Sequence, residues 1–306
     1  MIESLKQEII RHGDRAAVVP IGRLQSLRQD VAELKDSGVL NDFQHDIVDN
    51  IYQLDKPDAD FKIHSLLIVA SPSPSSATIT FNRNGKRIPL TLPAAYVDNA
   101  TAPARIERYL QTYLNPRGYH VQYAPRLPRK LLAVRSGLGL YGKNNICYVQ
   151  GMGSYLNLAP YVSDIPAGDD GWHEICHMEI CHSCQACFRN CPTGAITQTR
   201  FLIDNERCLT YFNEAGREWE FPEWIDPSVH HTLYGCTRCQ AVCPANREYL
   251  TNAIEAAEFT EEETSLLLEG EPFERFPEEL RQKVNALDMK QYLGALPRNM
   301  RVLFAS

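Results

Sequence analysis

The chain has 306 residues, of which 44% are hydrophobic and 23% are charged, and its formal net charge is −7. This composition is ordinary for a soluble globular protein of one to three domains, and no apolar run approaches the ~20 residues that cross a bilayer. The acidic balance argues against a dedicated nucleic-acid binder, which usually carries a basic face. Two short basic stretches, 83–87 and 126–135, are read as solvated charges, with a local phosphate-binding patch as the alternative.

The N-terminal segment, residues 1–15, has the periodicity of an amphipathic helix. It lacks the apolar core and the small-residue cleavage site of a signal peptide, so we expect a cytoplasmic protein without a membrane partner. The ten cysteines fit that compartment, which keeps thiols reduced. They therefore indicate metal or cluster ligation rather than disulfides.

Helices and strands are mixed along the first half of the chain. Apolar residues at helical spacing between 24 and 34 indicate a helix that ends near Gly38, and the apolar run 64–70 is typical of a buried strand. The alternating run 77–92 contains Asn84-Gly85, a strong signal for a two-residue hairpin turn. Further helices are expected at 103–114 and 127–135, and short strands at 120–124 and 146–150.

We predict an α+β fold in three parts. Residues 1–165 form a domain of sheet and helices, and 166–171 are expected to be a linker. Residues 172–250 form a bacterial two-cluster ferredoxin-like domain, and 251–306 form a helical tail. In the tail, Thr260 and Glu263 have the spacing of a capping box, and Pro277 is expected to begin another helix.

The most specific pattern is a set of eight cysteines between Cys181 and Cys243. The first four have the spacing Cys-x2-Cys-x2-Cys-x3-Cys-Pro of bacterial ferredoxins, in which the fourth cysteine ligates the other cluster. The second half repeats this run, with residues 209–235 inserted after its first cysteine. We predict two 4Fe–4S clusters, with structural zinc as the alternative. The first would be held by Cys181, Cys184, Cys187 and Cys243, and the second by Cys191, Cys208, Cys236 and Cys239.

Two cysteines remain outside this set. Cys147 lies in an apolar run, which favours a packing role over chemistry. Cys176 is close in sequence to His173, His177 and His182. Those four residues are interpreted as a surface loop, with a further metal site as the alternative.

The segment from Gly137 to Asn144, Gly-Leu-Gly-Leu-Tyr-Gly-Lys-Asn, satisfies the pattern G-x-G-x-x-G. Dinucleotide-binding and P-loop motifs both follow a strand, whereas a helix is expected here, and Asn144 stands where a P-loop needs a hydroxyl. We therefore predict close backbone approach, either to another chain segment or to a flat ligand. A second loop of small residues follows at 151–158.

With these parts in order, the chain resembles the epoxyqueuosine reductase family. The resemblance rests on the segment 136–144, on Gly153-Ser154-Tyr155, on Tyr234-Gly235-Cys236 and on the split cysteine set. It implies a cobalamin-binding N-terminal domain and reduction of an epoxide on a modified tRNA base. An electron donor such as a ferredoxin or flavodoxin would supply the clusters. The implied cofactor-binding residues are Gly137, Gly139, Gly142, Lys143, Asn144, Gly153, Ser154 and Tyr234.

The chain departs from the family at the proton donor, which is an aspartate in an Asp-Ser-Ala-Pro segment. Here that segment reads Gln122-Tyr123-Ala124-Pro125. A tyrosine can act as a general acid where neighbouring cations lower its pKa, and Arg126, Arg129 and Lys130 are near in sequence. We predict Tyr123 as the proton donor, with a packed strand residue as the alternative.

Several functions stay open. The first is a cobalamin-dependent reductase like the family, with tRNA or another substrate. The acidic balance, and the lack of room for the family's C-terminal repeats, weaken the expectation of tRNA. The others are an electron-transfer or corrinoid-activating protein and a ferredoxin-like binding module. The aromatic insertion 213–231 is either a substrate lid or a packed loop.

Overall fold

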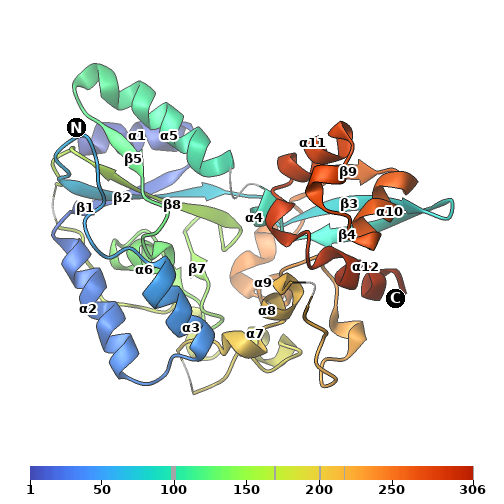
Figure 1. The fold of residues 1–306 in the computed structure, drawn as a ribbon. Helices are drawn as coiled ribbons and strands as arrows, with labels where there is room; N and C mark the ends of the chain where they lie inside the picture. The colour runs from blue at the N-terminus through green and yellow to red at the C-terminus, as the bar shows by residue number, and fades with distance from the viewer. Residues whose placement is uncertain (98–100, 169, 200, 217, 306) are drawn as a thin grey trace. The chain divides into compact units, whose positions relative to one another are not determined.

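The protein is described from a computed structural model. The structure describes residues 1–97, 101–168, 170–199, 201–216 and 218–305. The chain divides into two compact units, each described by itself below (Figure 1). The first comprises Met1–Pro72, Thr101–Gln185 and Arg200–Leu202, and the second Ser73–Ala100, Ala186–Thr199 and Ile203–Ser306. None of the helices in these described stretches has the length and apolar character that a membrane span requires.

The first unit is built on a four-stranded antiparallel sheet of order β1-β2-β8-β5. The expected strand at 64–70 is β2 (Ser65–Pro72), which lies between β1 (Arg15–Pro20) and β8 (Leu156–Ser163). The short edge strand β5 (Val121–Tyr123) pairs with the other side of β8. The apolar run of β2 is therefore explained by a position inside the sheet.

Helices cover both faces of this sheet. Leu67 and Val69 pack with α1 (Ile2–Arg11) and α5 (Thr101–Leu114). The alternate residues, Leu66 and Ile68, pack with α2 (Arg23–Asp36) and α6 (Arg129–Arg135). Figure 1 shows α1 and α5 on one side of the sheet and α2 and α6 on the other. Burial on both faces is why this strand reads as a continuous hydrophobic run.

Smaller elements complete the first unit. Helix α3 (Asp42–Asp46) follows α2 and begins with a capping box between Asn41 and Gln44. A two-stranded hairpin pairs β6 (Leu140–Tyr141) with β7 (Cys147–Tyr148). This hairpin directly follows α6, so it carries the glycine segment.

The second unit contains a three-stranded sheet of order β4-β3-β9. The predicted hairpin is confirmed: β3 (Ser76–Arg83) and β4 (Lys86–Leu92) pair up to Arg83 and Lys86, and Asn84 and Gly85 have φ of 51° and 70°. Positive φ at both central residues is the requirement of a type I′ turn. Strand β9 (Ala253–Phe259) runs parallel to β3.

One short helix after β4 and three helices from the C-terminal part of the chain pack on this sheet. They share one core with β3 and β9, and they are α4 (Ala94–Val97), α10 (Glu261–Glu269), α11 (Glu278–Ala286) and α12 (Leu296–Ala305). The predicted capping box of Thr260 and Glu263 is present, and Pro277 is the residue before α11. The cysteine segments form only short helices, α7 (Ala186–Asn190), α8 (Leu209–Glu214) and α9 (Arg238–Ala241).

The mixed helix-and-sheet fold class is confirmed, but the compact units do not follow the three predicted segments. The β3–β4 hairpin precedes α5 in sequence and yet belongs to the second unit, because β3 pairs with β9. The predicted tail 251–306 is likewise part of that unit rather than a separate appendage. The expected linker 166–171 includes Asp169, which lies outside the described residues.

Candidate functional site

The glycine segment begins where α6 ends. The backbone N–H groups of Leu138 and Gly139 both donate to the Ala133 carbonyl, at 2.9 and 3.1 Å, and Gly137 has a φ of 72°. The reversal therefore needs a residue that tolerates the left-handed region. The element before the glycines is a helix, as predicted, which is not the context of a dinucleotide or P-loop motif.

The glycines allow close packing within the chain. A Cβ on Gly139 would lie 2.6 Å from Cys147 Sγ and 2.8 Å from the Tyr148 carbonyl oxygen. A Cβ on Gly142 would lie 2.6 Å from the Tyr148 ring, and one on Gly137 would lie 2.7 Å from the His173 ring. The predicted close approach is therefore made to other segments of the same unit.

Polar contacts lock the turn of this hairpin. Asn144 is buried, and its Nδ2 donates to the Tyr148 hydroxyl at 3.0 Å. Lys130 Nζ donates to the carbonyl oxygen of Asn145 at 2.9 Å. Burial raises the pKa of the Cys147 thiol to about 12, which agrees with its packing role. Asn144 thus holds the loop in shape through its own neighbours.

The segment leading into the cysteine run is bound to this hairpin. Tyr141 donates its N–H to the Cys176 carbonyl at 3.0 Å, and Met178 donates to the Tyr141 carbonyl at 2.9 Å. Farther along, Lys143 Nζ approaches the carbonyl oxygen of Cys184 at 3.4 Å. The glycine segment and the first two predicted ligands, Cys181 and Cys184, therefore belong to one structural unit.

The other six predicted ligands lie in the second unit. There burial is the largest cause of a raised pKa for the Cys208 and Cys236 thiols, and Cys191 is close enough to raise both of these pKa values further. Three residues assigned to the second cluster are thus neighbours. The Thr193 hydroxyl lies 3.7 Å from Cys191 Sγ. Full ligation of each cluster by the predicted set stays a prediction.

Contacts outside the cysteine pattern shape these loops. Asn190 Nδ2 donates to the Arg238 carbonyl at 3.0 Å, which ties α7 to α9. The Thr237 N–H donates to His231 Nε2 at 3.3 Å, so the histidine supports the loop between Cys236 and Cys239. Burial lowers the pKa of His231 and favours this neutral, accepting form. No motif in the sequence marked these roles.

Tyr123 stands at the end of β5, where it is partly buried. Its hydroxyl accepts a hydrogen bond from Arg129 Nη2 at 3.0 Å, and its N–H donates to Glu107 Oε1 at 2.9 Å. Burial raises the pKa of Tyr123, while Arg129 acts in the opposite direction. The expectation of a lowered pKa is therefore not supported, although one cation does contact the phenol.

The two other cations near Tyr123 are engaged elsewhere. Arg126 donates to the carbonyls of Asn50 and Ile51, and Lys130 donates to Asn145. Gln122, the second residue aligned with the family's donor, donates to the Asp58 carbonyl at 2.9 Å. Arg129 is thus the one of the three predicted cations with a hydrogen bond to Tyr123 in the described residues.

Tyr234 lies in the core of the second unit. It is completely buried, stacks on Tyr292 with a centroid distance of 4.3 Å, and meets Tyr96 edge-on at 5.3 Å. Among the described residues its hydroxyl has no hydrogen-bond partner. Gly153 and Ser154, by contrast, lie in the first unit, where Ser154 is buried and Gly153 has a φ of 61°.

The described residues of the insertion 213–231 are packed only in part, with Asn213, Ile225 and His230 buried. Phe212 and Ile225 share a small core with Leu209, while Trp219 and Trp224 are 42% and 50% exposed. Helix α12 holds the insertion: Arg298 Nη1 donates to the Trp219 carbonyl at 2.6 Å. Asn299 Nδ2 donates to the Asn213 and Leu233 carbonyls at 2.7 and 2.8 Å. The sequence analysis did not predict this anchor, because the contact joins residues that lie more than 60 positions apart in the chain.

Residues 180–246 match the family described as a 4Fe-4S double cluster binding domain. Curated epoxyqueuosine reductases are similar in sequence. The protein of Shewanella oneidensis is 37% identical over 127 residues, 42% of this chain and 30% of its own length. That of Escherichia coli is 38% identical over 127 residues, 42% of this chain and 32% of its length. The matched region spans only about a third of these relatives.

Solved structures share the fold. An epoxyqueuosine reductase from Bacillus subtilis, with its catalytic aspartate loop swung out of the active site, has a TM-score of 0.66 at 20% identity. A structure of epoxyqueuosine reductase with a modified tRNA-Tyr stem loop has a TM-score of 0.64 at 20% identity. Each match covers 100% of this chain and 82% of the other. The resemblance to this family, drawn from the sequence, is confirmed.

Proposed function

We propose that this chain is an iron–sulfur reductase that uses two 4Fe–4S clusters and cobalamin, as a divergent relative of the epoxyqueuosine reductases. One observation carries the proposal. The glycine segment is hydrogen-bonded through Tyr141 and Lys143 to the chain that enters a double-cluster cysteine run. A redox centre in that run would therefore be attached firmly to the loop expected to hold the second cofactor.

The residues suit iron–sulfur clusters. Eight thiolates in the ferredoxin spacing are the donor set that two cubanes require. Hydrogen bonds and charges near the sulfurs adjust the reduction potential. Thr193 at Cys191 and the Lys143 ammonium at the Cys184 carbonyl are such groups. The positive charge of the Lys143 ammonium would favour the reduced state of the cluster that Cys184 is expected to ligate.

The fit to cobalamin is partial and rests on the second small-residue loop. Gly151 has a φ of 80°, and no atom lies within 4 Å of the position of a Cβ. Asn157 is buried nearby in sequence, and its Nδ2 has no partner among the described residues. That amide could bond to the amide groups on a corrin rim. Cobalamin, when bound, would supply a cobalt centre that takes up single electrons and reacts with electrophilic carbon.

Tyr123 is proposed to supply the proton. Its hydroxyl already accepts from Arg129, so its own proton is free to point toward a substrate oxygen. Burial raises its pKa, which keeps the phenol protonated at neutral pH. A phenol is a weaker acid than a carboxyl group, and burial weakens Tyr123 further as an acid.

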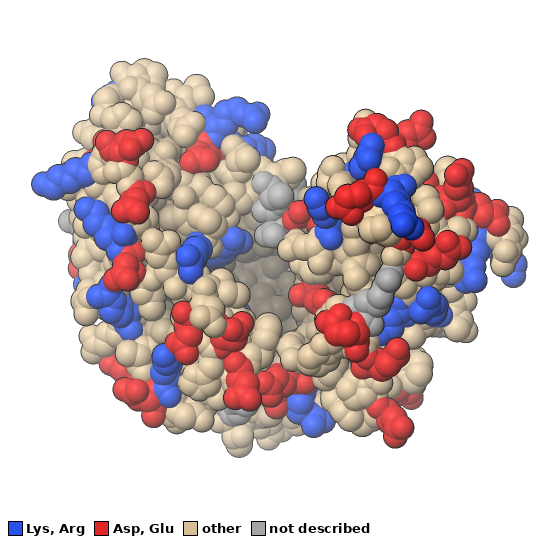
Figure 2. Space-filling model, viewed as in Figure 1, with Lys and Arg blue, Asp and Glu red and all other residues tan. Residues whose placement is uncertain are grey.

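We propose a modified base in tRNA as the first substrate to test, because one similar structure was determined with such a stem loop. A ferredoxin or flavodoxin is the expected electron donor. Figure 2 shows acidic and basic side chains interspersed over the visible face. Because this face shows no uniformly basic surface for the tRNA backbone, recognition of the modified base itself would have to contribute much of the selectivity for the tRNA.

The test begins with anaerobic reconstitution. Iron and sulfide are measured together with cobalamin retained after gel filtration, and the product is sought from epoxyqueuosine-containing tRNA. Cys184→Ser should lower the iron content, whereas Cys176→Ser should not, because Cys176 is exposed and lies outside the ligand set. Zinc in place of iron, or no retained corrinoid, would remove the proposal. Retained cofactors without turnover of that tRNA would remove only the substrate.

A further inference from the structure

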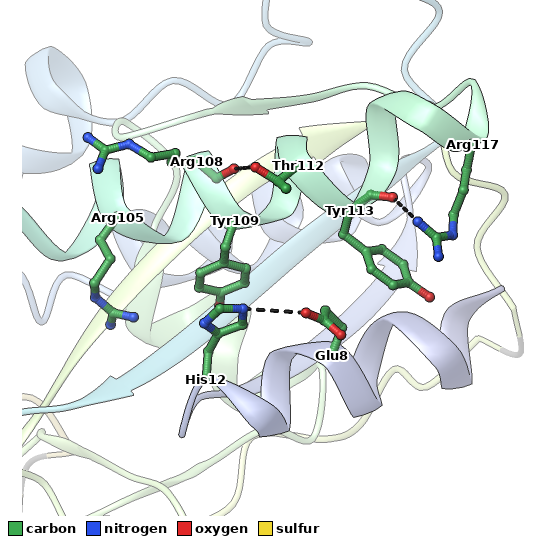
Figure 3. Close-up of a pocket in the computed structure, with 8 residues that line it drawn as sticks. All are labelled: Glu8, His12, Arg105, Arg108, Tyr109, Thr112, Tyr113 and Arg117. Carbon is green, nitrogen blue, oxygen red and sulfur yellow. Dashed lines mark hydrogen bonds and ion pairs between the residues drawn. The ribbon is translucent and has the colours of Figure 1, made fainter.

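A cleft lies between α1 and α5, the two helices that cover one face of the sheet in the first unit (Figure 3). It measures about 530 Å³, within the roughly 300–1,000 Å³ range of small-ligand sites. Its lining residues come from these two helices and the turns after them: Glu8, His12, Arg105, Arg108, Tyr109, Thr112, Tyr113 and Arg117. None of them belongs to the glycine segment or the cysteine set.

The cleft is positively charged in a chain whose net charge is −7. The lining contains three arginines and a single carboxylate, Glu8, and that carboxylate is already engaged. Its Oε2 accepts from Arg11 at 3.0 Å, and its Oε1 lies 3.4 Å from His12 Nε2. The second nearby carboxylate, Asp14, is fully buried, accepts from the Tyr109 hydroxyl at 2.8 Å and forms an ion pair with Arg105 at 3.4 Å, which leaves Arg108 and Arg117 uncompensated by it. The exposed charge of the cleft is therefore cationic.

The arginines retain donors for a ligand. Arg108 is exposed, and its guanidinium forms no hydrogen bond or ion pair with any residue that the structure describes. Arg117 uses one nitrogen on the Tyr113 carbonyl at 2.5 Å. Arg105 is already engaged by the Ser71 hydroxyl at 2.6 Å and by the Asp14 carboxylate at 3.4 Å, so Arg108 and Arg117 are the principal donors for a ligand. Guanidinium groups present several N–H donors in a plane, which suits phosphate oxygens.

Flat surfaces lie between these cations. The His12 ring stacks on Tyr109 with a centroid distance of 4.0 Å and an interplanar angle of 6°. The Arg117 guanidinium lies 3.8 Å from the centroid of Tyr113. In Figure 3 the stacked pair lies between Arg105 on one side and Tyr113 and Arg117 on the other. His12 is exposed, so its outer face can stack with a nucleobase, whereas Tyr109 is buried beneath it and supports it.

We infer that this cleft binds the phosphate ester of a planar aromatic base, that is, a nucleotide. The arginines would hold the phosphate, and the aromatic surfaces would contact the base. Such a nucleotide can be free or can belong to an RNA strand. The inference is independent of the proposed reductase activity, because it uses neither the clusters nor the glycine segment.

The test measures binding to the reconstituted full chain by isothermal titration calorimetry. The probes are adenosine 5′-monophosphate, adenosine, inorganic phosphate and a 5′-phosphorylated hexa-adenylate. Arg108→Gln and Arg117→Gln should each weaken binding of the monophosphate by about tenfold, because each removes a charged hydrogen-bond donor. The matched control is Arg275→Gln in the second unit, an exposed arginine whose loss should leave binding unchanged.

A further variant tests the base. His12→Ala should weaken adenosine 5′-monophosphate but leave inorganic phosphate unchanged. Hexa-adenylate binding more tightly than the monophosphate, through the same arginines, would identify RNA as the source, and equal or weaker binding would identify free nucleotide. Absence of saturable binding, equal loss in Arg275→Gln, or phosphate binding as tightly as the monophosphate would overturn the inference. Circular dichroism of each variant verifies folding.

Discussion

Replacement of Gly139 by alanine tests the close contact that joins the glycine segment to β7. The new Cβ would lie 2.6 Å from Cys147 Sγ and 2.8 Å from the Tyr148 carbonyl oxygen. The sulfur could move only within a buried core, and the carbonyl belongs to a strand paired with β6. Overpacking of this kind costs about 1–3 kcal/mol, so we expect Gly139→Ala to lower the free energy of unfolding by that amount.

The assay is urea unfolding of the anaerobically prepared protein, followed by far-ultraviolet circular dichroism. Gly171→Ala is the matched control, because nothing lies within 4 Å of a Cβ there and its φ is not positive. It should be close to neutral. The double variant Gly139→Ala with Cys147→Ala should be more stable than the sum of the two single changes predicts, since one clash disappears. Strict additivity, or an unchanged Gly139→Ala, would refute the close packing derived above.

The remaining predictions concern protons and potentials. If Tyr123 supplies the proton, Tyr123→Phe should abolish turnover and keep the iron content. Because burial raises its pKa, wild-type turnover should also show no loss from deprotonation of this group below pH ~10. Lys143→Met removes a positive charge near Cys184 and should lower the potential of the first cluster, while Thr193→Val should lower only that of the second. Redox titration followed by electron paramagnetic resonance checks both, and equal shifts in both clusters would contradict them. Burial lowers the pKa of His230 to about 4 in the folded protein, so this histidine binds a proton at a higher pH in the unfolded state than in the folded state. Stability should fall by up to about 3 kcal/mol as the pH drops from 7 to 4, and His230→Gln should remove this slope in pH-dependent urea unfolding.

Local signals were the part of the fold that the sequence could predict. The Asn84-Gly85 turn needs positive φ at two adjacent residues, and few other dipeptides tolerate it. The Thr260 and Glu263 capping box satisfies backbone donors within one helical turn. Each depends on neighbours in sequence alone. For the same reason the predicted strand at 64–70 and the helix at 103–114 were found within a few residues of their bounds.

Strands defined by distant partners were missed. Strand β8 contains Pro160, and a proline argues against an interior strand. It is tolerated beside β5, whose pairing with β8 ends at Tyr123 and Tyr161, just before the proline. Strand β9 reads Ala-Ile-Glu-Ala-Ala-Glu-Phe, a composition that favours a helix, and its pairing with β3 overrides that preference. The division into units could not be predicted without that pairing.

The candidate site shows the same limit in chemical terms. The glycine pattern predicted close approach of the backbone but not the type of partner. The absence of a Cβ shows that space is needed next to the backbone, and it does not show which group occupies that space. In the structure Cys147, Tyr148 and His173 occupy that volume at the three glycines 137, 139 and 142. These glycines therefore fix the shape of a hairpin. Through its N–H and its carbonyl, Tyr141 of this hairpin bonds to Cys176 and Met178 in the chain before Cys181. A bulkier residue at Gly137 would press on His173 in the segment that leads to the first two cysteines, and one at Gly139 or Gly142 would distort the hairpin that holds this segment. The requirement for glycine at these positions therefore follows from ligand placement even before a flat cofactor is considered.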